Sequence, residues 1–254
     1  MNADTLLNSF EILVEAPNGI SQLRELILRL AISGKLVKQQ ESDGRGHDLV
    51  SAICNHKGIE PSKIRTAKSD FPRNWTMARI GELMHLEMGQ SPESDSYNQR
   101  GDGLPFYQGK TDFGPFTPTP RFWCSSPTKV ANAGDVLISV RAPVGPTNYV
   151  TEKSCIGRGL AALSPLGGMR TDFVLWWIRG YESQIAAMGT GTTFIAVSKK
   201  NLYPFEIAVP PLSEQERIVA KITELMALCD QLESKLHVRT RLAEKFARSA
   251  VSAI

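Results

Sequence analysis

The sequence lacks any long apolar run. No stretch of about 18 apolar residues occurs, the length that a helix needs to cross a bilayer, so we expect no membrane span. Its first residues carry neither a basic nor an apolar stretch, so we expect no secretory signal. Cys54, Cys124, Cys155 and Cys229 form no CxxC pair and do not cluster with the histidines. This spacing predicts reduced thiols, no metal site and a cytoplasmic protein.

A strong charge excess is also missing. The formal net charge is +3 on 254 residues, which does not by itself indicate a nucleic-acid-binding protein. Any basic surface must therefore come from the local arrangement of side chains.

The motifs of common enzyme sites are absent or broken. Between Gly103 and Thr111 the spacing of the glycines differs from that of a phosphate-binding loop, and no helix signal follows. Gly189–Gly191 lacks the third glycine of a dinucleotide turn, and Val209–Leu212 lacks the Asn and the aromatic residue of an amino-methyltransferase loop. Glu214 and Glu216 are interpreted as carboxylates that favour the dipole of a helix start. The sequence thus predicts a non-catalytic chain.

Aromatic residues are present, but almost only in the middle of the chain. Seventeen of the nineteen Phe, Trp and Tyr residues lie between Phe71 and Phe205, and only Phe10 and Phe246 lie outside. This distribution predicts a compact central domain bracketed by helices. The predicted division is an N-terminal helical segment 1–38, a linker 39–70, a central domain 71–211 and a C-terminal helix 212–254.

The sequence predicts two helices in the N-terminal flank and both strands and a helix in the central domain. Leu6, Leu7, Phe10 and Leu13 predict a first helix, while Ile20, Leu23, Ile27 and Leu30 predict a second that ends at Gly34. The linker has room for a short helix near 47–57. Apolar runs at 135–140, 159–163 and 205–209 predict strands, and 172–188 predicts a helix. The expected fold class is α+β.

The C-terminal flank has the clearest periodicity in the chain. After Pro211, Ser213 is an N-cap candidate and Glu216 completes a capping box. Seam positions then recur by four and three, all of them apolar or small except Arg239: Ile218, Ile222, Leu225, Cys229, Leu232, Leu236, Arg239, Ala243, Phe246 and Ala250. This heptad seam predicts a coiled-coil helix of roughly 50 Å that meets a partner. The alternative is a long helix packed on its own domain.

Six groups of residues follow one another in an order that is specific as a set. They are Leu23–Leu28 with Gly34–Val37, Phe71–Trp75, Ile80–Leu83 with Gly89–Pro92, Gly134–Ser139 with Arg141 and Gly145, Gly191–Phe194 with Val197–Leu202, and Pro210–Ile222 with Asp230–Glu233. Together they strongly resemble the specificity subunits of type I restriction-modification systems. The resemblance covers most of the chain outside 39–70.

That resemblance implies a fold and a role. The implied architecture is a strand-rich target recognition domain with N-terminal helices and a long C-terminal spacer helix. The implied role is to recognise one half of a bipartite target in double-stranded DNA and to dock a methyltransferase subunit, which an endonuclease subunit joins in the complex. The resemblance also implies no cofactor on this chain, with S-adenosylmethionine, Mg and ATP bound by partner subunits only.

The chain departs from the family in length. A complete subunit carries two recognition domains and two spacer helices, whereas this chain has one of each. It is therefore either a fragment of a longer subunit or a natural half-subunit. In a lone half, the helix seam (Ile218, Ile222, Leu225, Cys229, Leu232, Leu236 and Phe246) can pair with its copy to give a homodimer.

Polar loops of the central domain supply the candidates for DNA contact. Base edges are read by amides, hydroxyls and guanidinium groups, and phosphates are held by cations and hydroxyls. We expect several of the following to converge on one face: Gln90, Ser91, Tyr107, Gln108, Lys110, Thr111, Arg141, Arg158, Thr192, Thr193, Lys199 and Lys200.

Two other functions are compatible with parts of the pattern. One is a coiled-coil adaptor that binds another protein and no DNA, which a salt-dependent binding test on random duplexes would distinguish. The other is a monofunctional DNA methyltransferase, which the missing motifs disfavour and which binding of S-adenosylmethionine would revive.

Overall fold

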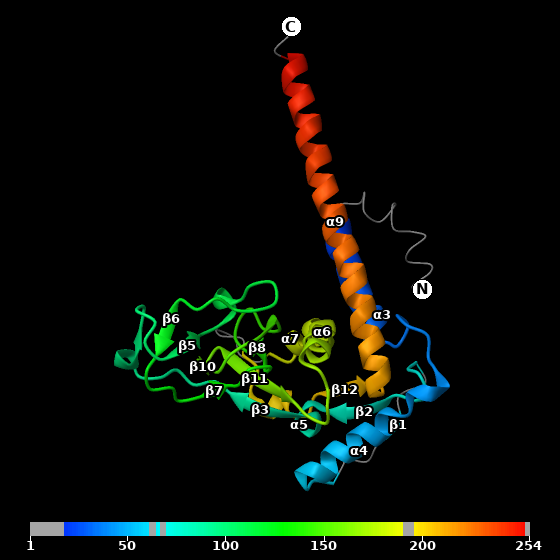
Figure 1. Ribbon diagram of the computed structural model, residues 1–254, viewed down its shortest axis with the longest axis vertical. Coiled ribbons are helices and arrows are strands. Elements are labelled where there is room, and N and C mark those ends of the chain that lie inside the picture. The colour runs from blue at the N-terminus through cyan, green and yellow to red at the C-terminus, as the bar shows by residue number, and fades with distance from the viewer. Residues whose placement is uncertain (1–17, 61–64, 67–69, 190–195, 252–254) are drawn as a thin grey trace.

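The computed structural model describes residues 18–60, 65–66, 70–189 and 196–251. Within these ranges a strand-rich domain lies at the base of one long helix, α9 (Leu212–Val251), which projects away from it (Figure 1). This arrangement confirms the predicted α+β class. None of the helices so described combines the length and the apolarity that a bilayer crossing requires.

The strands of the described ranges form three sheets. Their orders are β3-β11-β8-β9, β4-β6-β5-β10-β7 and β1-β2-β12, and all pairs are antiparallel except β5 with β10. The strands are β1 (Arg65–Thr66), β2 (Thr76–Arg79), β3 (Met84–Met88), β4 (Tyr97–Asn98), β5 (Leu104–Tyr107), β6 (Phe122–Cys124), β7 (Val130–Ala131), β8 (Val136–Ser139), β9 (Thr147–Tyr149), β10 (Ser154–Ile156), β11 (Leu160–Pro165) and β12 (Glu206–Val209).

The predicted strands at 135–140, 159–163 and 205–209 correspond to β8, β11 and β12. β8 is buried along its whole length because it separates two apolar clusters. Val136 and Ile138 face the main core, while Leu137 faces a second cluster that contains Ile156. Since successive side chains of a strand point to opposite faces, a strand covered on both sides needs a continuous apolar run.

The helix predicted over 172–188 is two helices. The chain bends at Tyr181, between α6 (Thr171–Gly180) and α7 (Glu182–Ala187). At Gly180 an added Cβ would lie 2.3 Å from Ile32, so α6 ends where the N-terminal helix presses against it. The Tyr181 hydroxyl accepts a 3.1 Å hydrogen bond from the backbone N–H of Ala208, which holds the bend onto β12.

The remaining helices are shorter than α9. They are α3 (Gly19–Ile32), α4 (Gly46–Lys57), α5 (Ile80–Leu83), α8 (Lys199–Leu202) and the 3-10 turns η1 (Glu41–Asp43), η2 (Ser94–Ser96) and η3 (Lys110–Asp112). α3 ends as predicted, with Gly34 following at φ +70°, the left-handed conformation that glycine adopts without strain. The helix predicted before it lies outside the described residues.

The stretch 39–70 is not mainly a linker. The helix allowed there is α4, whose Leu49, Val50, Ile53 and Cys54 belong to the main core. The Lys57 ammonium donates to the carbonyl oxygens of Gly81 and Met84 at 2.6 and 3.2 Å and so pins α4 to the start of the central domain. Because the stretch is polar overall, its composition gave no indication that one face of α4 is apolar.

The seam of α9 has two different halves. Ile218, Ile222, Leu225 and Cys229 are buried in one cluster with the apolar stripe of α3, and both α3 and α6 pack against α9. The prediction that these four positions meet a partner is therefore wrong, because the chain covers them with its own N-terminal helix (Figure 1).

Beyond Cys229 the helix is covered less completely. Leu232 and Leu236 are half-buried and pack against the main core, while Val238 and Leu242, each one residue before a seam position, are 55% and 51% exposed. Phe246 lies within α9, but its side chain is outside the described part. The outer half of α9 therefore carries an exposed apolar edge at Val238 and Leu242, beside the seam.

The start of α9 is tied to η1 rather than capped by Ser213. The helix already begins at Leu212, so Ser213 lies inside its first turn, and the Ser213 hydroxyl donates to the carboxylate and the carbonyl of Asp43. Arg217 donates to both carboxylate oxygens of Asp43 at 2.6 Å. This ion pair lowers the pKa of Asp43, so the bond is retained at neutral pH.

All four cysteines are free and buried. Burial raises the pKa of Cys155 to about 12, with its neighbour Cys124 as a second cause. A thiol held in this state has little thiolate and is chemically inert.

Candidate nucleic-acid interface

A cavity of about 520 Å³ lies where four loops of the central domain meet. The loops follow β3, join β5 to β6, join β8 to β9 and join β10 to β11. Its lining consists of Ser91, Tyr97, Phe106, Gln108, Gly109, Lys110, Thr111, Ser139, Arg141, Ala142, Pro143, Arg158 and Gly159. These residues include three cations and no carboxylate, so the cavity favours an anionic ligand.

Six of the twelve residues predicted to contact DNA line this one cavity: Ser91, Gln108, Lys110, Thr111, Arg141 and Arg158. Gln90 is exposed beside Ser91 but is not part of the lining. Lys199 and Lys200 are exposed at the start of α8, also outside the lining. Thr192 and Thr193 lie outside the described residues.

The prediction that Tyr107 contacts DNA is wrong. Its side chain is 4% exposed and packs in the second apolar cluster with Leu137 and Ile156. Burial raises the pKa of its hydroxyl. Phe106, the preceding residue of β5, points to the opposite cluster, so the alternation of the strand turns Tyr107 inward and leaves Gln108 as the first residue of the loop.

A tight turn presents Arg158 to the cavity. A Cβ on Gly159 would lie 2.3 Å from the Gln108 carbonyl oxygen, and one on Gly157 would lie 3.2 Å from the Gln108 Cα. The Gly157 N–H also donates to the Tyr107 carbonyl at 2.8 Å. Glycine on both sides of Arg158 therefore lets this turn press against the neighbouring loop, which fixes the backbone from which the arginine extends.

Arg141 extends from an equally constrained turn. The Ser139 hydroxyl donates to the Arg141 carbonyl at 3.0 Å, and the Gly145 N–H donates to the Ser139 carbonyl at 2.9 Å. Arg141 also forms a β-bridge with Ala196, three residues before Lys199. The turn is thus joined to the segment that leads into α8.

A buried carboxylate that the sequence interpretation missed shapes the loop after β5. Asp112 accepts from the backbone N–H of Gln108 at 2.7 Å and from the Arg121 side chain at 2.8 Å. Arg121 in turn donates to the Thr111 hydroxyl at 3.0 Å. Asp112 and Arg121 therefore hold the loop that carries Gln108, Lys110 and Thr111, without lining the cavity themselves.

Replacing Asp112 with asparagine is expected to weaken DNA binding about tenfold, the equivalent of about 1.4 kcal/mol spent on ordering the loop. Removing a negative charge would by itself strengthen DNA binding, so a loss identifies the loop as the cause. Fluorescence anisotropy with a labelled duplex measures it. Asp102→Asn, the same charge change at an exposed position, is the control; equal or tighter binding by the Asp112 variant would contradict the role of the carboxylate.

Arg179 anchors the other side of the same loop. Its guanidinium lies 5.2 Å from the Phe116 ring centroid and 5.1 Å from that of Trp176, and it donates to the Pro115 carbonyl at 2.6 Å. Burial lowers its pKa, and Glu182, the nearby carboxylate, has a pKa raised by burial. In the sequence, Arg179 is only a basic residue inside a predicted helix, and nothing there indicates this contact.

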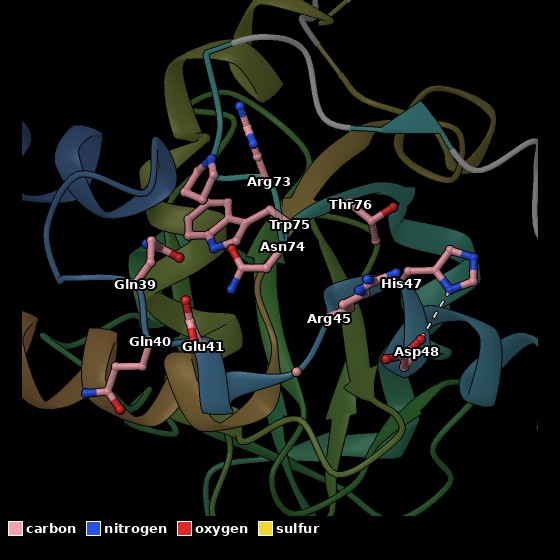
Figure 2. A pocket seen from close by; sticks show the side chains of 12 residues that line it. Gln39, Gln40, Glu41, Arg45, His47, Asp48, Arg73, Asn74, Trp75 and Thr76 are labelled. Carbon is pink, nitrogen blue, oxygen red and sulfur yellow. Dashed lines mark ion pairs between the residues drawn. The ribbon is translucent and has the colours of Figure 1, made fainter.

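A second cavity, of about 950 Å³, lies at the other end of the domain. Figure 2 shows Gln39, Gln40 and Glu41 on one side of it and Arg45, His47 and Asp48 on the other, with Asn74 and Trp75 between them. It carries charges of both signs and none of the predicted DNA contacts.

Glu214 adjoins this second cavity and joins three segments. Its side chain is 0% exposed, and its carboxylate accepts from Gln39 at 2.8 Å and from Asn74 at 3.2 Å. Burial raises its pKa. The prediction that Glu214 only serves the helix dipole is therefore incomplete: it connects α9 to the segment after α3 and to the start of the central domain.

Comparison with known proteins supplies an independent observation. The sequence model of the family described as "Type I restriction modification DNA specificity domain" matches residues 72–239. The putative type I restriction enzyme MjaX specificity subunit of Methanocaldococcus jannaschii is 39% identical over 190 residues, which are 74% of this chain and 43% of that protein. The type I restriction enzyme EcoAI specificity subunit of Escherichia coli is 29% identical over 85% of this chain and 41% of its own length.

Solved structures agree with the sequence comparisons. The HsdS subunit from Thermoanaerobacter tengcongensis is 36% identical with a TM-score of 0.60, over 91% of this chain and 52% of that one. A chain from a structure on complex assembly and conformational transition of the type I R-M system is 35% identical with a TM-score of 0.62, over 94% and 55%. The present chain thus spans about half the length of the relatives that it matches.

Proposed function

The chain belongs to the type I restriction-modification DNA specificity family, and on that premise we propose that its central domain reads one half of a bipartite DNA target while its helices dock a methyltransferase subunit. The observation that carries this proposal is the convergence of six polar loop residues on one cavity without a carboxylate. Side chains that read base edges must approach the groove together, from a backbone that is already ordered.

The helices support the second part of the proposal. α9 has 40 residues, about 60 Å at 1.5 Å per residue, and its outer half keeps apolar side chains in solvent. Such an edge suits another helix, supplied either by a methyltransferase subunit, by the second half of a longer subunit or by a copy of this chain. A rigid helix pair of this length would fix the distance between two reading domains.

The chain itself is proposed to be non-catalytic. We assign S-adenosylmethionine, Mg and ATP to the methyltransferase and endonuclease subunits, which act on DNA in the cytoplasm. The relatives are about twice as long, so the second half-site would be read by a second recognition domain, from the same polypeptide or from a homodimer partner.

Lys199→Glu combined with Lys200→Glu is expected to weaken binding to any duplex at least about tenfold at low salt, without a change in thermal stability. Both ammonium groups are exposed at the start of α8, where they can neutralise phosphates. The slope of log K against log salt should fall by about 2, one unit for each lost phosphate contact. Anisotropy titrations at several salt concentrations give both values.

The control is Lys35→Glu with Lys38→Glu, the same charge change in exposed residues beside α3. An equal loss in both double variants would remove Lys199 and Lys200 from the contact surface. Binding by the unaltered chain that does not respond to salt, or no binding at all, would contradict DNA recognition and leave the adaptor function.

A further inference from the structure

Two arginines of the cavity have no side-chain partner among the residues that the structure describes. Neither the Arg141 nor the Arg158 side chain makes a hydrogen bond or an ion pair with any residue in the described ranges, whereas Arg121 and Arg179 nearby are both bound. A guanidinium presents five N–H donors in a planar fork. Both forks are therefore available to a ligand.

The backbones behind these two arginines are held in place. The turn that carries Arg158 is pressed against Gln108, and the turn that carries Arg141 is bonded through Ser139 and bridged to Ala196. A long side chain on a fixed backbone loses less freedom when it binds, so it discriminates better between ligands of similar shape.

The chemistry of the lining selects among the bases. Guanine presents two adjacent acceptors, O6 and N7, in the major groove, and an arginine fork matches them with two hydrogen bonds. Cytosine presents an amino donor there, which a carboxylate accepts best, and the lining contains no carboxylate. Gln108 and Ser91 add hydrogen-bonding groups of either sense beside the forks.

We infer that the half-site read by this domain contains guanine, and that Arg141 and Arg158 are the residues that recognise it. The inference rests on the proposed function, because it names the bases read at the same cavity. A phosphate also accepts an arginine fork, so the experiment must separate base recognition from backbone contact.

The experiment selects bound duplexes from a random library with the full chain and sequences them, for the unaltered protein and for Arg141→Lys and Arg158→Lys. Lysine keeps the charge but cannot form the fork. The unaltered chain should enrich a G·C pair at one or more positions. Each variant should lose the preference at such a position by about tenfold or more, while binding to unselected DNA changes by less than about twofold.

Arg100→Lys is the matched control, since Arg100 is an exposed arginine of the same domain outside the cavity. Enriched sites without guanine, or variants that retain the full preference, would overturn the inference and leave the proposed function standing. A uniform loss across all sequences would identify the arginines as phosphate contacts and overturn it as well. Salt-dependent binding with no enriched sequence would instead contradict sequence recognition itself.

Discussion

Ile222→Ala is expected to lower the free energy of unfolding by about 3 kcal/mol, the usual cost of removing a fully buried aliphatic side chain and leaving a cavity. Ile222 is 0% exposed, in the cluster that α9 shares with the stripe of α3. Urea denaturation followed by the fluorescence of buried Trp75 and Trp177 measures the change.

The exposed apolar edge of the outer half of α9 is expected to behave in the opposite way. Leu242→Asp should leave the unfolding free energy within about 0.5 kcal/mol, since Leu242 is 51% exposed and touches no core cluster. It should abolish self-association or methyltransferase docking, because it places a charge in the apolar edge. Analytical ultracentrifugation and co-purification with the methyltransferase subunit test both. Normal assembly of the Leu242 variant, or an equal stability loss in both variants, would contradict the division of α9 into a packed inner half and a partner-binding outer half.

Glu214→Ala is expected to be the second severe substitution, with a loss of about 3 kcal/mol. The half-buried side-chain amide of Asn74 would lose its acceptor, which costs about 1–3 kcal/mol, whereas the exposed amide of Gln39 can bond to water instead. The space left by the fully buried Glu214 side chain adds to the loss. The variant should also loosen α9 from the central domain, which protease cleavage near residue 212 would detect. Glu216→Ala, an exposed carboxylate of the same helical turn, is the control.

Glu214→Gln separates the charge from the shape of the side chain. Burial raises the pKa of Glu214 above its ordinary value of 4.5, so the pKa is higher in the folded than in the unfolded chain. The contribution of this titration to the free energy of unfolding is fully present below pH 4.5 and is lost as pH rises through the pKa of the folded state. Glutamine does not titrate, so the stability difference should shift in favour of the variant as pH rises above about 4.5. Parallel pH profiles for the two proteins would show that the carboxyl does not titrate as inferred.

The loops at the candidate site illustrate how far residue type alone carries a prediction. Ser91, Gln108 and Arg158 were identifiable because polar residues beside glycines mark loops between buried strands. Tyr107 was not, since the direction of a side chain at a strand end depends on which face each cluster covers. Asp112 and Arg179 gave no signal, because their role lies in bonds to residues that only the fold brings near.

The sequence by itself determined the family, the α+β class, the strands β8, β11 and β12, the end of α3 just before Gly34 and the long helix α9. These features follow from local periodicity and from residues with fixed conformational preferences. Only the tertiary structure decided that α3 covers Ile218 to Cys229, that Glu214 is a buried joint and that 39–70 contributes α4 to the core. The physical reason is that a periodic apolar face shows that a helix must be covered, but which surface covers it depends on where distant segments pack.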